Sequence, residues 1–231
     1  MEEMRDYKPI QPRGGGPNMR KILERVGGLA VLIGTTALKW GFIFVKFFGF
    51  FISVAAYTLW FHSWTFALGF VLMILVHELG HAAEARRQGL DVSAPMFIPF
   101  FGAYVKIRHA GLTPWRNALI SLAGPAAGGA AAAVVWAIGA QRDSTMLIVL
   151  ANIAFLLNLF NLIPIGFLDG GQISRSMMEA WRMPVIQFEG GVPVNAFAPD
   201  RKHALMIGFL YAGLAVLLLI GLLATNHAGG V

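Results

Sequence analysis

The sequence predicts an all-α polytopic membrane protein with about five transmembrane helices, or six. Of its 231 residues, 57% are hydrophobic and 13% are charged, whereas soluble domains carry about 25% charged residues. The basic residues, which give a net charge of +6, stand at the ends of apolar segments and form no dense patch. That placement fits orientation in a lipid bilayer, so we expect the bilayer and no nucleic acid as a partner.

Two segments precede the central part of the chain. Residues 1–25 are rich in Pro, Gly and charged side chains, so we expect a flexible cytoplasmic tail. The apolar stretch 26–60 would measure about 50 Å as one helix, which is too long for a single crossing. Lys39 and Lys46 divide it. We therefore expect an interfacial helix followed by a first transmembrane span; two full spans are the alternative.

The rest of the chain contains four more apolar segments. We expect a membrane core over residues 64–182, a cytoplasmic hairpin-like loop over 183–202 and a C-terminal transmembrane span over 203–225. Thr113 followed by Pro114 is typical of the first turn of a helix and should open the second span of the core. Pro164 ends the third span of the core, because proline cannot continue a helix.

Lysine and arginine positions indicate how these spans are oriented. With five crossings and a cytoplasmic N-terminus, every Lys and Arg outside the first apolar stretch, except Arg142, falls on the cytoplasmic side. This is a strong positive-inside bias. We therefore expect a multi-pass protein of the cell membrane with its N-terminus toward the cytoplasm.

The apolar segment that begins at Trp64 runs directly into His77-Glu78-Leu79-Gly80-His81. On a helix the two histidines lie one turn apart on the same face, where both imidazoles reach one metal ion. In this pattern the glutamate acts as a general base rather than as a ligand. Ionisable groups are costly inside a membrane unless they bind or pair, so we interpret His77 and His81 as metal ligands and Glu78 as catalytic. Two histidines merely hydrogen-bonded within a helix bundle are the alternative.

A tetrahedral metal site with an open position needs a third protein ligand. The chain has no cysteine, so histidine and carboxylate must supply the ligands, which suits zinc in a hydrolytic role. Apart from Glu78, only Asp169 among the acidic residues adjoins a long apolar run without a partner nearby in sequence. Gly170 and Gly171 would allow a sharp bend beside the metal. The alternative role for Asp169 is the N-cap of the helix that follows it.

Residues 91–108 interrupt the helical pattern. Pro95, Pro99 and Gly102 exclude a helix, and the aromatic and β-branched residues between them favour one or two short strands at the membrane surface. An edge strand there would bind an extended peptide through main-chain hydrogen bonds; a structural loop packed on the bundle is an equally good interpretation. The candidate substrate-binding residues are Phe101, Gly102, Ala103 and Tyr104.

The order of these motifs resembles the site-2 protease family of intramembrane zinc metalloproteases. The resemblance covers roughly residues 64–182 and is carried by the segments 77–81, 97–103, 123–125, 161–164 and 168–170. It implies one zinc ion per chain, held by His77, His81 and Asp169. It also implies Glu78 as general base and Asn161 near the scissile carbonyl. The sequence differs from many members at Gly128, where they carry an asparagine.

The resemblance implies a zinc-dependent metalloendopeptidase that hydrolyses peptide bonds in or near transmembrane segments of membrane-protein substrates. Residues 64–182 are then its catalytic membrane core, with the active site toward the cytoplasm. The alternative is a membrane metal transporter or sensor that cuts no peptide. A transporter would need ligands leading to the other face, and the candidates, Asn152 and Asn158, are poor zinc ligands. The sequence indicates neither a particular substrate nor an oligomeric state.

Overall fold

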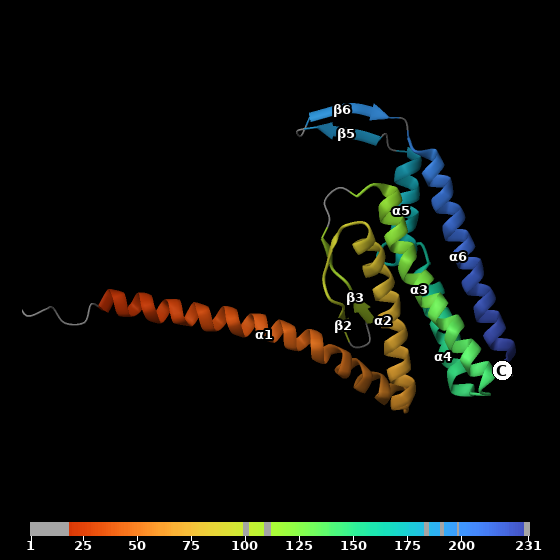
Figure 1. Ribbon diagram of the computed structural model, residues 1–231, viewed down its shortest axis with the longest axis horizontal. Helices are drawn as coiled ribbons and strands as arrows, with labels where there is room; N and C mark the ends of the chain where they lie inside the picture. The colour runs from red at the N-terminus through yellow and green to blue at the C-terminus, as the bar shows by residue number, and fades with distance from the viewer. Residues whose placement is uncertain are drawn as a thin grey trace, which may run out of the picture. The chain divides into compact units, whose positions relative to one another are not determined.

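The computed structural model describes residues 19–98, 102–108, 112–182, 185–189, 192–197 and 199–228 (Figure 1). The chain divides into two compact units, residues 1–45 and 46–231. In the first unit the described residues are the N-terminal part of helix α1, and residues 20–39 are exposed. The residues predicted to bind metal all belong to the second unit.

Helix α1, Met19–Phe61, is one continuous helix of 43 residues. The sequence suggested an interfacial helix and a separate span over this stretch, divided at Lys39 and Lys46. Neither lysine interrupts the helix, because lysine is a good helix former and leaves the backbone hydrogen bonds intact. The helix is therefore continuous at both lysines, although the division between the two compact units falls at Lys46. The expected interfacial helix and first span stay a prediction.

Three helices form the centre of the second unit: α2 (Trp64–Arg87), α3 (Pro114–Gln141) and α4 (Thr145–Asn161). Each follows a Ser or Thr whose side-chain oxygen accepts a backbone N–H of the first turn. Such a cap satisfies a donor that the helix itself leaves unpaired. The predicted cap at Thr113, followed by Pro at the first helical position, is confirmed.

Helix α3 is the central helix of the bundle. It contacts α2, α4, α5 (Asp169–Arg182) and α6 (Arg201–Ala228). Figure 1 shows α3 between α2 and α6. A Cβ atom at Gly80 of α2 would lie 2.4 Å from the carbonyl oxygen of Ala123 and 2.7 Å from the Cβ of Ala127. Only glycine fits this contact, so small residues bring α2 and α3 unusually close together.

Three described helices, α2, α3 and α6, are long and apolar enough to cross a membrane. Helix α4 has 17 residues, and the stretch Phe48–Phe61 at the end of α1 is also apolar but shorter. At 1.5 Å per residue α4 measures about 26 Å, close to the ~30 Å thickness of a hydrocarbon core. The mostly helical, membrane-type fold is thus established, and the count of five or six crossings stays a prediction.

Four short strands occupy the connection between α2 and α3, where the sequence predicted a small β element. Strand β1 (Asp91–Val92) pairs with β4 (Ile107–Arg108), and β2 (Met96–Ile98) pairs with β3 (Gly102–Tyr104); both pairs are antiparallel. Phe97 of β2 packs edge-on against Phe50 near the end of α1, with ring centroids 5.3 Å apart. Strand β3 contacts α2, which brings this β element beside the helix that carries the histidines.

The chain returns from α4 through a loop to α5, whose first residue is Asp169. A Cβ atom at Gly170 would lie 2.0 Å from the carbonyl oxygen of Leu162, and one at Gly171 would lie 2.1 Å from that of Ile165. Both glycines belong to α5, and neither has a positive φ. The expected reason for them, a sharp bend, is therefore wrong: they let the start of α5 pack directly on the loop that precedes it.

Between α5 and α6, strands β5 (Val185–Glu189) and β6 (Val192–Phe197) pair as an antiparallel hairpin. Helix α6 then runs beside α4 and α5. The hydroxyl of Tyr211 on α6 donates a hydrogen bond to the carbonyl oxygen of Leu162. This bond ties α6 to the loop that leads to Asp169.

Candidate metal centre and active site

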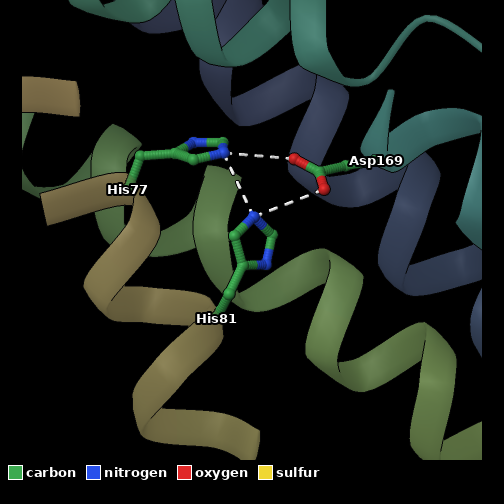
Figure 2. Close-up of side chains that lie close together, drawn as sticks. All are labelled: His77, His81 and Asp169. Atoms are coloured by element: carbon green, nitrogen blue, oxygen red, sulfur yellow. Dashed lines mark hydrogen bonds and ion pairs between the residues drawn. The ribbon is translucent and has the colours of Figure 1, made fainter. Parts of the chain in front are cut away.

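Helix α2 presents His77 and His81 one turn apart, and the start of α5 points Asp169 toward them (Figure 2). The Nε2 atoms of the two histidines lie 3.1 Å apart. The carboxylate reaches both rings, with 3.2 Å between Asp169 Oδ2 and His77 Nε2 and 3.3 Å between Asp169 Oδ1 and His81 Nε2. Within the part of the chain that the structure describes, these three residues form a group that could hold a metal ion.

The other ring nitrogen of each histidine has a fixed hydrogen-bond acceptor. His77 Nδ1 lies 2.8 Å from the amide oxygen of Asn158, and His81 Nδ1 lies 2.8 Å from the carbonyl oxygen of Ile120. A carbonyl oxygen only accepts, so each Nδ1 carries a proton. In a neutral ring Nε2 then has a free lone pair directed at its neighbours, which is the form in which histidine binds metal.

These positions fit a tetrahedral zinc ion. Zinc holds histidine and carboxylate ligands at about 2.0–2.2 Å, so the ligand atoms of a regular tetrahedron lie about 3.3–3.6 Å apart. The two Nε2 atoms lie 3.1 Å apart, and each lies 3.2–3.3 Å from a different oxygen of the Asp169 carboxylate. One ligand atom from each residue lies within 4.8 Å of the other two, so small side-chain shifts bring the group to that spacing. Two nitrogen lone pairs and a carboxylate repel one another at such distances unless positive charge lies between them. The donor set therefore suits a cation.

Glu78 follows His77 on α2 and lines the same cavity as the three candidate ligands, a space of about 780 Å³. Val105, the residue after β3, lines the same cavity. A carboxylate that shares a cavity with a metal site but lies outside the ligand set is suited to take up and return a proton. Glu78 thus borders the same cavity as the candidate ligands, and its role as general base stays a prediction.

Part of the predicted substrate strand borders the same cavity. Ala103 and Tyr104 line it, and Gly102 pairs with Ile98 in the β2–β3 sheet. Phe101 lies outside the described residues. Strand β3 therefore presents main-chain and side-chain groups to the space in front of the candidate ligands.

Asn161, the last residue of α4, also lines the cavity. Its side-chain Nδ2 donates to the carbonyl oxygen of Leu157 at 3.1 Å, so its amide is engaged along its own helix. The structure thus brings Asn161 to the cavity wall, and its amide would have to leave Leu157 to reach a bound peptide.

Two residues that surround the histidines were not apparent from the sequence. From the sequence, Asn158 is only a poor ligand on a transport path; in the structure it is fully buried and contacts His77. Gly124 lies so close to His81 that a Cβ atom would be 2.1 Å from the ring Nε2. One signal points to Asn158 beforehand: an asparagine within an apolar helix needs a polar partner once it is buried.

Comparison with known proteins agrees with this chemistry. The family model described as "Peptidase family M50" matches residues 65–144 and 140–192, a region that includes Glu78 and all three candidate ligands. A Synechocystis protein named "Putative zinc metalloprotease sll0528" is 28% identical over 166 residues, which are 69% of this chain and 42% of the relative. A Mycobacterium tuberculosis protein named "Putative zinc metalloprotease Rip3" is 34% identical over 131 residues, which are 52% of this chain and 33% of the relative. The chain thus spans less than half the length of these relatives.

Proposed function

This chain belongs to peptidase family M50, and we propose that it is an intramembrane zinc metalloprotease that hydrolyses peptide bonds in or near transmembrane segments of other proteins. One observation supports the proposal above all. The candidate ligands His77, His81 and Asp169 share one cavity with the Glu78 carboxylate, and both histidines stand on a helix that is apolar and long enough to cross a membrane.

In this proposal His77, His81 and Asp169 hold one zinc ion per chain. When bound, zinc polarises the scissile carbonyl and lowers the pKa of water toward about 7. Glu78 takes the proton of the attacking water and passes it to the leaving amine. Asn161 donates its amide N–H to the carbonyl oxygen as negative charge develops there.

The peptide must be extended where it is cut, because the hydrogen bonds of a helix shield its carbonyl groups. Ala103 and Tyr104 of β3 border the cavity. An unwound segment added along strand β3 (Gly102–Tyr104) would be held by main-chain hydrogen bonds, with little dependence on its sequence. Substrates are therefore expected to unwind readily near the cut, as segments with glycine or proline do.

We place the chain in the cell membrane with five crossings, its N-terminus and active site toward the cytoplasm. The count adds α4 and the apolar stretch Phe48–Phe61 to the three longer helices. The distribution of Lys and Arg supports this orientation, since Arg142 alone then lies on the outer side among the basic residues beyond the first apolar stretch.

Glu78→Gln tests this proposal in the full chain, reconstituted in lipid vesicles with a mixture of single-span peptides. We expect the wild type to release peptide fragments detectable by mass spectrometry and the variant to release none. The zinc content should be equal in both, because glutamine cannot take the proton but leaves the three ligands in place. Glu179→Gln on α5 is the matched control and should cleave like the wild type.

Removal of the metal gives a second readout of the same site. Chelation should stop cleavage by the wild type, and added Zn²⁺ should restore it. A metal transporter or sensor would bind zinc through the same ligands and tolerate Glu78→Gln. Cleavage that persists in that variant, or zinc uptake into vesicles without any cleavage by the wild type, would contradict the proposed protease.

A further inference from the structure

Asn158 of α4 has its whole amide engaged in the interior of the bundle. The residue is 0% exposed. Its Nδ2 donates to the carbonyl oxygen of Ala154 at 2.8 Å, and its Oδ1 lies 2.8 Å from His77 Nδ1. The bond to Ala154 fixes which end of the amide is nitrogen, so the oxygen must be the atom that faces His77.

This contact determines how the ring of His77 is protonated and turned. An amide oxygen accepts only, so Nδ1 of His77 donates and Nε2 keeps its lone pair toward His81 and Asp169. We infer that Asn158 is a positioning residue for the metal centre, one that holds His77 in the tautomer and ring orientation needed to bind zinc. The inference rests on the proposed function, because it assigns a partner to one of the proposed zinc ligands.

Gly128 of α3 makes the space that Asn158 occupies. A Cβ atom at this position would lie 2.2 Å from Asn158 Oδ1 and 2.6 Å from its Nδ2. The neighbouring Gly129 instead faces α6, where a Cβ atom would lie 2.4 Å from Cδ2 of Leu218. A methyl group at Gly128 therefore meets a polar group held at both ends, whereas one at Gly129 meets the tip of a flexible side chain.

A purely structural asparagine would behave differently from a positioning residue. If Asn158 only stabilises the fold, an apolar residue of similar size should lower stability, because the buried Nδ1–H of His77 loses its acceptor, but it should leave the zinc affinity unchanged. If it orients His77, the same replacement must weaken zinc binding even where the fold survives. Partners of metal-ligating histidines typically contribute about 10- to 100-fold in affinity.

The first test compares Asn158→Leu with Asn158→Asp in the full chain, purified in detergent. Zinc affinity is measured by competition with a chelator, and the absorption bands of Co²⁺ in place of zinc report the ligand geometry. We expect Asn158→Leu to raise the zinc Kd about 10- to 100-fold and to change the Co²⁺ spectrum. Asn158→Asp should keep the zinc Kd close to that of the wild type, because its carboxylate still accepts the Nδ1 proton, but it should be less stable because it cannot donate to the carbonyl oxygen of Ala154.

Asn152→Leu is the matched control on the same helix. Its amide contacts Leu222, Thr225 and Asn226 of α6, so it should lower thermal stability without changing the zinc Kd. An Asn158→Leu variant that folds and binds zinc as tightly as the wild type would overturn the inference and leave the proposed protease intact. A wild-type chain that binds no zinc would overturn both.

A second test needs no folded Asn158→Leu variant. Gly128→Ala should weaken zinc binding because its methyl group displaces the amide from His77. In an Asn158→Ala background that methyl group meets no amide, so Gly128→Ala should add little further loss. The two effects on zinc affinity should therefore be far from additive. Gly129→Ala should leave the affinity unchanged in both backgrounds, and fully additive effects of Gly128→Ala and Asn158→Ala would overturn the inference.

Discussion

Helices α3 and α6 are both apolar and both 28 residues long, yet they lie in different surroundings. In α3, 50% of the most apolar stretch is buried inside the protein, whereas in α6 the buried share of the corresponding stretch is 11%. A Cβ atom at Gly124 or Gly128 of α3 would collide with polar side chains of the site. At Gly213 of α6 no described atom lies within 4 Å of such a Cβ atom.

The difference shows that α3 builds the site without supplying a metal ligand. The carbonyl oxygen of Ile120 accepts the Nδ1 proton of His81, and Gly124 leaves room for the ring of that histidine. None of the described residues that line the site cavity belongs to α6; this helix packs on α3 and α5 and bonds through Tyr211 to the loop before Asp169. We therefore expect substitutions on α3 to affect zinc binding and substitutions on α6 to affect mainly stability.

Among the substitutions in α3 and α6, Gly124→Ala should have the largest effect on zinc affinity. The new Cβ atom would lie 2.1 Å from Nε2 and 2.4 Å from Cε1 of His81, so the ring must leave its position or α3 must move away from α2. We expect zinc affinity to fall by about 100-fold or more, and the free energy of unfolding to fall by about 1–3 kcal/mol. Chelator competition and thermal unfolding in detergent measure the two effects.

Gly213→Ala is the control for this substitution, because it makes the same change in a helix where space is open. It should stabilise α6 by roughly 0.5–1 kcal/mol, since alanine is the better helix former. If Gly124→Ala bound zinc as tightly as Gly213→Ala, the contrast between a crowded α3 and an open α6 would not hold.

Tyr211→Phe should have an intermediate effect, because it removes the hydrogen bond from α6 to the loop before Asp169. The hydroxyl donates to the carbonyl oxygen of Leu162, and Leu162 is buried with 4% exposure. Leaving this carbonyl unsatisfied should cost about 1–3 kcal/mol of unfolding free energy. The zinc Kd should rise by less than in Gly124→Ala, since the loop that positions Asp169 is still held by the glycines of α5. Phe209→Leu, at an exposed position of α6, is the control and should change neither measurement.

The sequence predicted those parts of the fold and site that depend on local geometry. The spacing of His77 and His81 places both rings on one face of any helix, and Thr113 caps a helix through atoms three residues away. Asp169 could be selected because few carboxylates adjoin apolar runs in this chain. The family resemblance is confirmed by the match to the M50 model.

The sequence could not predict features that depend on how distant helices pack. Asn158 and His77 meet only because α3 lets α2 and α4 approach, and a departure from the family pattern, glycine at position 128, is what makes room for the asparagine. From the sequence, Gly170 and Gly171 suggest a bend. The structure shows instead that they leave room for the carbonyl oxygens of the preceding loop. Lys39 and Lys46 do not interrupt the helix, because charge alone breaks no backbone hydrogen bond, yet the division between the two compact units falls at Lys46.

Substitution of Asp200, at the first turn of α6, should have the smallest effect on the zinc site. Asp200 precedes the helix, and its carboxylate accepts hydrogen bonds from the Nδ1 of His203 at 2.5 Å and from the backbone N–H of the same residue at 3.1 Å. These bonds, the side-chain bond first, hold the pKa of Asp200 below its usual value. Asp200→Ala should lower the free energy of unfolding by about 1 kcal/mol at neutral pH, and Asp200→Asn should lose less because it retains an acceptor.

The pH dependence of this effect has a definite sign. Because the folded-state pKa of Asp200 lies below the unfolded value of about 3.9, its contribution to stability is fully present above that value and is lost as the pH falls through the folded-state pKa. The difference in Tm between the wild type and Asp200→Ala should therefore be constant near neutral pH and shrink below about pH 4. The zinc Kd, measured at neutral pH, should be the same in both. A clear change in zinc affinity would mean that the start of α6 controls the site as α3 does, and the distinction between the two helices would fail.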